Sequence, residues 1–449
     1  MDTMYVSLAA LALTVAFVIW STGRKKLNPF FALALAALGV GLLTGMPLPD
    51  IVAQLKAGFG DTMGKVGVLI ILGTTLGGIL EKTGATVRMA EYLIRSVSKK
   101  NAPLGIALTG YIIGFPVFCD SGFIVLNGLN HSMVRKTHWN MAVMATTLAT
   151  SLYAVHCLVP PHPGITAAIE TIGADFGTIM LLGALLSIPA AAVGLLYARW
   201  KGKRVADDYT PLTDASPEPA QLPPTWLSFL PVLLPISLIA CGSLAHLFAP
   251  QLQHFDRLVQ WLLFLGDPGI ALGAGILVAL FLVKRADRAK LPGWLTQGVE
   301  KAGVIVAIIG AGGMYGQLLQ HSGIGRDIGT LLGGTSLGIF LPFLITAFLK
   351  SAQGSSTVAV LTGASLIAPM LSNLGLDHPL GLSLAILSLG AGSMCVSHMN
   401  DSYFWVVSRF SGISATVTLK VFTTATMLMG MATQLLIWVI WVLAPTSWS

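Results

Sequence analysis

The stretch Phe118-Cys119-Asp120-Ser121-Gly122-Phe123 places a single acidic side chain within a long apolar part of the sequence. No Lys, Arg, Asp or Glu occurs between residue 101 and Asp120, and the next charged residue is Arg135. An ionisable group is costly inside a membrane and is a functional candidate by default. A buried carboxyl group also takes up a proton more readily than one in water. Asp120 is therefore the first candidate for a functional residue, and a purely structural pairing with Lys136 or His138 is the alternative.

The whole chain has the composition of an integral membrane protein. Only 10% of its 449 residues are charged, and its mean hydropathy is +0.78, which leaves too little charge to cover a soluble globule. Charge-free runs that exceed the roughly 20 residues of a membrane-spanning helix occupy residues 137–169, 302–325, 351–376 and 421–449. Because the chain also contains 49 Gly and 23 Pro, we expect a polytopic helical protein with broken helices.

The basic residues indicate membrane orientation. The formal net charge is +7, but Lys and Arg collect in short clusters at the ends of apolar runs, so no nucleic-acid partner is expected. Arg24-Lys25-Lys26 follows the first apolar run. If this cluster is cytoplasmic, the N-terminus lies outside. The first run lacks a basic leader and a small-residue cleavage site, which indicates a retained helix.

One polar segment, residues 206–225, divides the chain into an N-terminal half, residues 1–205, and a C-terminal half, residues 226–449. The segment contains four acidic residues and five prolines, which is the composition of a linker, here a cytoplasmic one. Three landmarks recur in the two halves at offsets of 239, 235 and 242 residues. They are Gly84 with Gly323, Asp120 with Ser355, and His156 with His398. These near-constant offsets predict an internal repeat.

The two repeats are expected to have opposite orientations in the membrane. By the charge rule, the helix over residues 66–80 runs inward, whereas its counterpart over residues 302–319 runs outward. Inverted repeats are typical of transporters that hold substrate near the membrane midplane between discontinuous helices. The predicted fold is therefore an all-α polytopic membrane protein with two inverted-topology repeats. The number of full spans between residues 101 and 199 stays open, because re-entrant segments and spans have the same hydropathy.

Two helix starts within the membrane are expected to form a carboxylate site. Asp120-Ser121-Gly122 precedes an apolar run and is expected to cap a short helix, and Gly354-Ser355-Ser356-Thr357 does the same in the second half. Helix N-termini offer free N–H groups and a partial positive charge, and the hydroxyl groups add further donors. Alternatively, these small residues serve only close helix packing.

Two further breaks contribute polar groups. Residues 155–164 contain three prolines, which interrupt a helix around His156, His162 and Gly164. Residues 397–402 supply His398, Asn400 and Asp401. Unwound backbone at membrane depth is tolerated only where it is buried in protein or lines a cavity. The alternatives are packed histidines in the first break and a surface loop in the second.

These observations define the candidate site. No local spacing of His, Cys, Asp or Glu predicts a metal site, and no cofactor is expected other than the coupling proton. Asp120 is the first candidate for the proton-coupling residue and Asp401 is the second. The expected substrate-binding residues are Asp120, Ser121, Gly122, His156, His162, Gly164, Gly354, Ser355, Ser356, Thr357, His398 and Asn400.

At these motifs the chain resembles the gluconate permease family of proton symporters, which also includes carriers of D-serine and of other small hydroxy or sugar acids. The resemblance runs nearly end to end and rests on the following pieces: Gly114-Phe115, Asp120-x-Gly122-Phe123, Pro160-Pro161-His162-Pro163-Gly164, Gly354-Ser355-x-Thr357-Val358-Ala359 and Ser397-His398-x-Asn400-Asp401. It implies a multi-pass carrier of the bacterial inner membrane that belongs to the ion-transporter superfamily. In such carriers each inverted repeat supplies a re-entrant helical hairpin and a broken helix to a transport domain that moves as an elevator. Proton coupling and a homodimer built on a separate scaffold domain are also implied.

Three residues beside the expected site depart from the family pattern. Cys119, Lys350 and Ser356 stand where the family implies an aromatic residue, Arg and Ala. A four-carbon aldonate is therefore a substrate to consider beside gluconate. The predicted function is proton-coupled symport of a small hydroxy-acid or sugar-acid monocarboxylate across the lipid bilayer into the cytoplasm. The alternatives are a D-serine or glycerate-type carrier, a sodium-coupled carrier and, from a different class, a membrane-embedded metalloenzyme. An enzyme is not expected, because neither a hydrolase nor an ATP-binding motif occurs.

Overall fold

The structure is a computed structural model of the chain. It describes residues 2–25, 27–95, 97–205, 222–248, 256–323, 338–399 and 401–443. These residues form helices and no strands, in agreement with the predicted all-α class. Most of the predicted linker, residues 206–221, lies outside the described residues, as does Asn400.

The helices have the lengths and composition of a multi-pass membrane protein. Among the described residues, six helices are long and apolar enough to cross a membrane, or up to eight if each of two bent pairs is one span. Shorter apolar helices of 10–17 residues accompany them. These shorter helices include Ser356–Met370, one of the two segments that the sequence predicts to enter the membrane without crossing it; the other lies in Cys119–Lys136, which is not among them.

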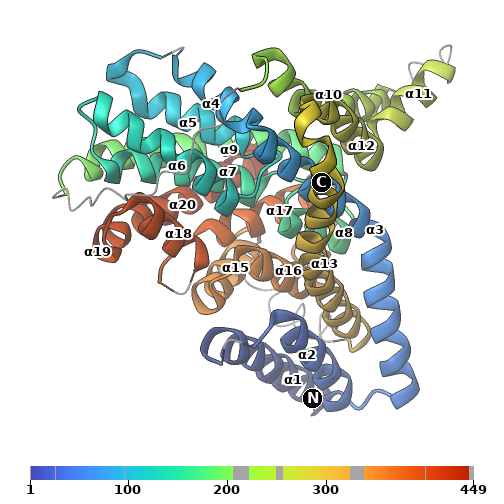
Figure 1. Ribbon diagram of the computed structural model, residues 1–449. Coiled ribbons are helices and arrows are strands. Elements are labelled where there is room, and N and C mark those ends of the chain that lie inside the picture. The colour runs from blue at the N-terminus through green and yellow to red at the C-terminus, as the bar shows by residue number, and fades with distance from the viewer. Residues whose placement is uncertain are drawn as a thin grey trace.

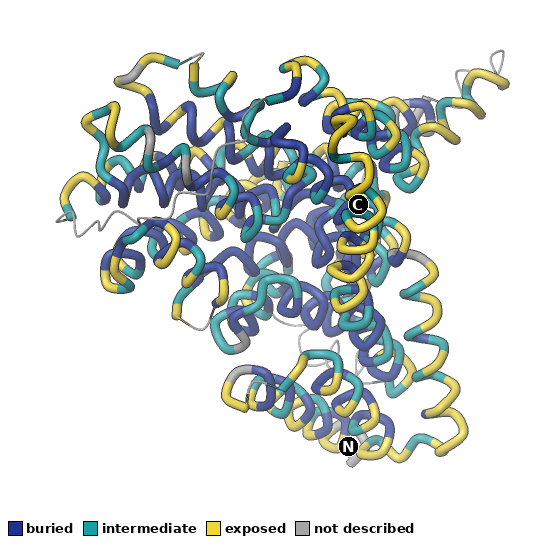
Figure 2. The backbone as a smooth tube through the Cα atoms, viewed as in Figure 1, coloured by how far each residue is buried: buried dark blue, intermediate teal, exposed yellow. Residues whose placement is uncertain are grey.

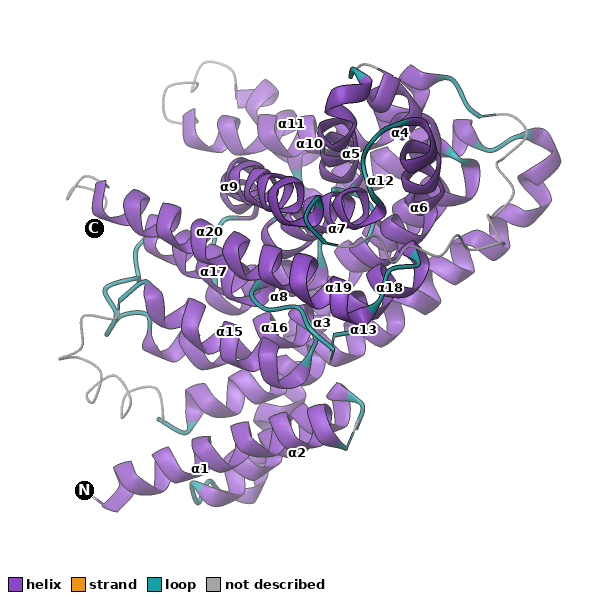
Figure 3. Cartoon of the chain, turned by 90° about the vertical axis from the view of Figure 1, so that its left-hand side faces the viewer, coloured by secondary structure: helices purple, strands orange, loops and turns teal. Residues whose placement is uncertain are grey.

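Two groups of helices lie at opposite ends of the molecule and are joined by two long helices (Figures 1 and 3). Helices α1 and α2 lie at one end, and α10, α11 and α12 lie at the other. Helices α3 and α13 pack along each other, and they also contact α12 and α2, respectively. The bounds are α1 (Asp2–Ile19), α2 (Pro29–Leu43), α3 (Leu48–Thr83), α10 (Thr225–Phe248), α11 (Asp256–Gly266), α12 (Pro268–Ala279) and α13 (Leu291–His321).

The structure refines the predicted elements in this part of the chain. The helix expected over residues 66–80 is the second part of α3, which bends by 42° between Gly64 and Gly67. Residues 256–266 form the amphipathic helix α11. Gly84, which ends α3, and Gly323, just after α13, both have φ of 76°. Glycine adopts this left-handed conformation without steric cost.

The remaining helices build the centre of the molecule. In each half a helical hairpin is followed by a broken helix and then by a long apolar helix. In the first half these are α5 (Ala102–Ile113), α6 (Cys119–Lys136), α7 (Met141–Leu158), α8 (Pro163–Ile172) and α9 (Phe176–Tyr197). In the second half they are α15 (Phe340–Gln353), α16 (Ser356–Ile367), α17 (Pro379–Met394), α18 (Ser402–Ser411) and α20 (Thr424–Leu443). The short helices α4 (Ala85–Arg95) and α19 (Ala415–Thr418) lie between longer ones.

The two hairpins pack on the broken helices of the opposite halves. Helix α6 packs on α18, and α16 packs on α8, while α7 and α17 contact each other. Figure 2 shows that the most deeply buried backbone runs through this central region. Every residue of α7 is buried except His156. The breaks predicted from the prolines and polar residues are present: residues 159–162 separate α7 from α8, and residues 395–401 separate α17 from α18.

Candidate substrate-binding site

A cavity of about 250 Å³ lies where the ends of both hairpins meet both helix breaks. Its wall also includes one face of α13. Of the predicted residues, those in the wall are Asp120, Ser121, His156, Ser355, Ser356, Thr357 and Asp401. The structure therefore brings together residues from four segments that are far apart in the sequence.

The first hairpin brings an unpaired carboxylate to the cavity. Helix α6 begins at Cys119, so Asp120 lies in its first turn and is not the cap that the sequence predicts. The extended backbone of Phe118 (φ −61°, ψ 144°) sets this earlier start, and its side chain makes no capping hydrogen bond. The Oδ1 atom of Asp120 is buried and has no hydrogen-bond partner in the described part of the chain. The alternative structural pair with Lys136 is not formed, because Lys136 stands at the opposite end of α6.

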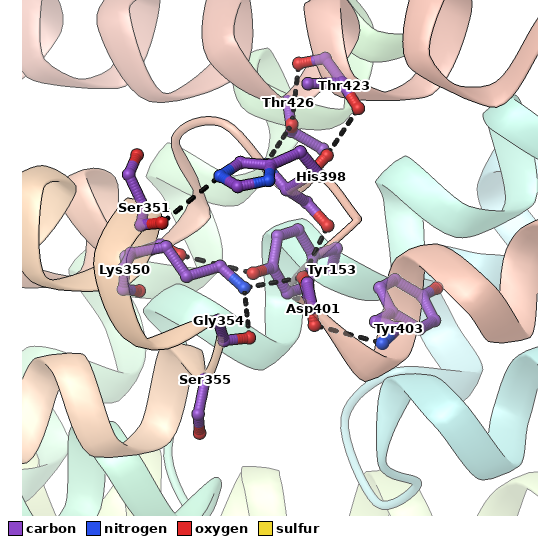
Figure 4. A network of polar contacts seen from close by, with 12 residues as sticks. Tyr153, Lys350, Ser351, Gly354, Ser355, His398, Asp401, Tyr403, Thr423 and Thr426 are labelled. Carbon is purple, nitrogen blue, oxygen red and sulfur yellow. Dashed lines mark hydrogen bonds and ion pairs between the residues drawn. The ribbon is translucent and has the colours of Figure 1, made fainter. Parts of the chain in front are cut away.

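Lys350 of the second hairpin and Asp401 of the second helix break are joined in a polar network (Figure 4). The Nζ atom of Lys350 lies 2.5 Å from Oδ2 of Asp401 and donates to the carbonyl of Gly354 at 2.9 Å. The hydroxyl of Ser397 donates to the same Oδ2 atom, and the backbone N–H of Tyr403 donates to Oδ1 at 3.0 Å. Lys350 and Asp401 are only 1% and 4% exposed. Asp401 is therefore neutralised and fully hydrogen-bonded.

Gly354 and Ser355 make this arrangement possible. Gly354 has φ of 84°, a left-handed conformation that ends α15 and suits glycine. Its carbonyl oxygen accepts the hydrogen bond from Lys350. Ser355 is the N-cap of α16, where its Oγ accepts from the backbone N–H of Val358 at 3.3 Å. The cap predicted for the second helix is thus present.

Two histidines are joined beside the cavity. The Nε2 atom of His162 lies 2.7 Å from the carbonyl oxygen of Gly114. A carbonyl oxygen only accepts, so this Nε2 donates. In a neutral pair, Nδ1 of His162 then accepts from Nδ1 of His156 across 3.2 Å. The Nε2 atom of His156 is consequently an acceptor, and His156 lines the cavity.

Several predicted residues lie behind the wall of the cavity. His162 is 2% exposed and supports His156. A side chain at Gly164 would place Cβ 3.2 Å from Cα of Thr357, so this glycine allows α8 to approach α16. Gly122 packs in the same way against Leu152. His398 lies with Nε2 3.2 Å from the carbonyl of Ser351, outside the cavity wall.

The cavity also contains residues that sequence reasoning did not select: Tyr153, Lys301 and Tyr403. The two tyrosine rings lie 5.3 Å apart, and Tyr153 lies below the ammonium of Lys350 at 5.8 Å. Tyrosines in apolar runs carry no distinguishing pattern. Lys350 does carry a signal, since it is the only Lys, Arg, Asp or Glu between Asp327 and Asp377.

The profile of the GntP family permeases matches residues 6–443. The chain belongs to this family.

Its GntP relatives are named as transporters. The gluconate permease of Pseudomonas aeruginosa is 35% identical over 93% of this chain and 94% of its own length. The high-affinity gluconate transporter of Escherichia coli K12 is 30% identical over 92% of this chain and 94% of its own length. The L-idonate transporter of the Gnt-II system from the same organism is 29% identical, with coverages of 89% and 90%. This GntP family member is accordingly a multi-pass membrane transporter and not an enzyme, which excludes the metalloenzyme alternative.

Solved structures share the GntP fold at low sequence identity. MtrF of Neisseria gonorrhoeae, described within a class of antimetabolite efflux pumps, matches with a TM-score of 0.58 and 14% identity over 94% of this chain and 96% of its own. The YdaH transporter of Alcanivorax borkumensis, described as having an unusual topology, matches with a TM-score of 0.55 and 14% identity over 89% and 90%. At this identity the likeness concerns the fold alone.

Proposed function

We propose that this GntP family permease is a proton-coupled symporter that imports gluconate or a related small hydroxylated monocarboxylate. The relatives named for gluconate and L-idonate support the class of substrate. The observation that carries the coupling is the buried, unpartnered Oδ1 atom of Asp120 in a cavity between two hairpin ends. The cavity is the proposed binding site.

The substrate carboxylate binds at the start of α6 in this proposal. The first N–H groups of a helix have no intrahelical acceptor. Phe118 supplies no side-chain cap, so these donors at α6 are available to a ligand anion. Ser356 and Thr357 face the same cavity from α16 and add hydroxyl donors. The substrate's own hydroxyl groups meet Ser121 and the acceptor nitrogen of His156.

Electrostatics then couples the anion to a proton. A substrate carboxylate beside an ionised Asp120 is repelled, and a proton on Asp120 removes this repulsion. The affinity for the substrate is therefore higher when the proton is bound, and the affinity for the proton is higher when the substrate is bound. Asp401 is the less suited of the two acids, because Lys350 already compensates its charge. A sodium ion at Asp120 would achieve the same compensation and is the alternative coupling ion.

Alternating access by two inverted repeats is part of the same proposal. It is supported by the common order of hairpin, broken helix and long helix in each half. The reciprocal packing of α6 on α18 and of α16 on α8 is the pattern expected of two related units. An elevator movement, a homodimer, an external N-terminus and the cytoplasmic linker over residues 206–225 stay predictions.

The test is uptake by the purified protein in liposomes. Labelled gluconate, a four-carbon aldonate and D-serine are compared under an imposed proton gradient, under a sodium gradient and with both gradients collapsed. The proposal expects concentrative uptake of a sugar acid that requires the proton gradient. Uptake that requires only the sodium gradient would show that sodium, and not the proton, is the coupling ion. Failure of every acid to enter would overturn the proposed substrate class.

A further inference from the structure

The charges around the cavity are not all accounted for by the proposed function. Among the described residues, the Asp, Glu, Lys and Arg side chains that reach the wall are Asp120, Asp401 and Lys301. Lys350 neutralises Asp401 from behind. Lys301 remains as a cation in the wall, and it forms no ion pair with any described residue.

The position of Lys301 is fixed by the packing of α13 on α3. Ile305, one helical turn later, lines the same cavity, so this face of α13 is turned toward it. One turn earlier, the hydroxyl of Thr74 donates to the carbonyl of Gly298 at 3.1 Å. A Cβ at Gly298 would lie 2.5 Å from Oγ1 of Thr75, so the two helices touch there. Lys301 thus reaches the cavity from a helix outside both hairpins.

We propose that Lys301 is a specificity-determining residue whose ammonium group pairs with the carboxylate of the substrate. This inference rests on the proposed function and adds the counter-ion that its site otherwise lacks. The N-terminus of α6 offers only partial positive charge, whereas Lys301 supplies a full one on a long, flexible side chain. A neutral polyol of the same size has no carboxylate group to pair with Lys301. Lys301 therefore selects acids over neutral sugars.

A structural role for Lys301 has one identifiable partner. Glu81, near the end of α3, is close enough to interact electrostatically with both Lys301 and Lys82. Neither lysine forms an ion pair with Glu81 within the described residues. Lys82 is exposed and does not line the cavity. It is consequently a matched control, because it shares the neighbour Glu81 but not the access to the substrate.

The experiment measures concentration-dependent gluconate uptake in liposomes for wild type, Lys301→Gln, Lys301→Arg and Lys82→Gln. A charge-assisted contact of this kind is worth roughly ten- to hundredfold in affinity. We expect Lys301→Gln to raise KM by that factor with a smaller change in the maximal rate. Lys301→Arg keeps the positive charge and should raise KM less, and Lys82→Gln should stay near wild type. Competition by sorbitol, a neutral polyol, should gain strength relative to gluconate only in Lys301→Gln.

Three results would overturn the inference, and they can be told apart. An unchanged KM in Lys301→Gln, with active wild type, removes the role of Lys301 and leaves the proposed function intact. Equal increases in KM for Lys301→Gln and Lys82→Gln would show that the effect arises through Glu81. Absence of acid uptake by the wild type defeats the proposed function and this inference together. Because Lys301 is exposed, its replacement is not expected to disturb folding. Size-exclusion elution together with the thermal shift caused by gluconate verifies that each variant is folded.

Discussion

The two acids of the cavity come from different kinds of element and have opposite surroundings: Asp120 belongs to the first hairpin and Asp401 to the second helix break. Asp120, in the first turn of α6, has a buried Oδ1 atom that has no hydrogen-bond partner among the described residues. Asp401, just before α18, receives hydrogen bonds from Lys350, Ser397 and the backbone of Tyr403. The helix starts differ in the same sense, since α16 is capped by Ser355 whereas α6 has no side-chain cap.

This difference indicates that the two hairpins have different roles in the site. An unpaired carboxylate in low dielectric changes its protonation or binds an ion when its surroundings change. A paired and hydrogen-bonded carboxylate instead holds two segments in a fixed position, here the end of α15 and the start of α18. We therefore infer that the first hairpin responds to substrate and proton, and that the second provides the rigid side of the site.

The largest effect is expected from removing the cation of the rigid side. Lys350→Met leaves Asp401 buried with no counter-ion, and breaking a buried pair in this way costs about 3–5 kcal/mol. Thermal unfolding in detergent should show a large loss of stability, and uptake should be lost. The double variant Lys350→Met with Asp401→Leu should recover most of the stability, because no uncompensated charge remains.

Lys350→Arg is the matched control for this prediction, since it keeps the positive charge. A Lys350→Met protein as stable as wild type would contradict the proposed division, because it would mean that Asp401 needs no partner. If Lys350→Met and the double variant are equally destabilised, the loss of stability would instead be due to side-chain packing.

A smaller effect, on transport and not on stability, is expected from a change in the first hairpin. Asp120→Asn removes no hydrogen bond at Oδ1, so stability should stay within about 0.5 kcal/mol of wild type. Uptake driven by a proton gradient should fall at least about tenfold, because an amide does not take up the coupling proton. Exchange of labelled for unlabelled substrate across the liposome membrane should persist, since this reaction needs no net proton movement.

Measuring both activities in the same liposomes separates coupling from binding. If Asp120→Asn still concentrates substrate against a gradient, Asp120 is not the coupling residue and Asp401 becomes the candidate. Loss of exchange together with uptake would assign Asp120 to substrate binding alone.

Much of the candidate site can be predicted from the sequence. An isolated acid, a run of prolines and a glycine followed by hydroxyl residues stand out against an apolar background, because each is costly or helix-breaking in a membrane. This contrast identified Asp120, the break before Pro163 and the cap at Ser355. It misplaced the start of α6 because Asp-Ser-Gly has the composition of a cap, whereas the extended backbone of Phe118 sets the start.

The rigid side was harder to predict, because its chemistry depends on pairings between distant residues. Lys350 and Asp401 are separated by 51 positions, and no local pattern records their contact. The family resemblance places Lys350 beside the expected site, and its isolation in apolar sequence distinguishes it as it does Asp120, but neither signal identifies Asp401 as its partner. Lys301 follows Glu300 at the polar part of a helix and resembles an ordinary surface charge. Its access to the cavity follows only from the crossing of α3 and α13.

The smallest expected effect compares two serines at the two helix starts. Ser355→Ala removes the cap of α16 and should lower stability by about 1 kcal/mol, because the N–H of Val358 loses its acceptor. Ser121→Ala, in the uncapped first turn of α6, should change stability by less than about 0.5 kcal/mol. Both serines face the cavity, so both variants should also raise KM. Thermal unfolding and uptake measured on the same preparations give the two quantities. Equal destabilisation by the two changes would mean that α6 is held as firmly as α16, and the distinction between a responsive and a rigid hairpin would have to rest on the carboxylates alone.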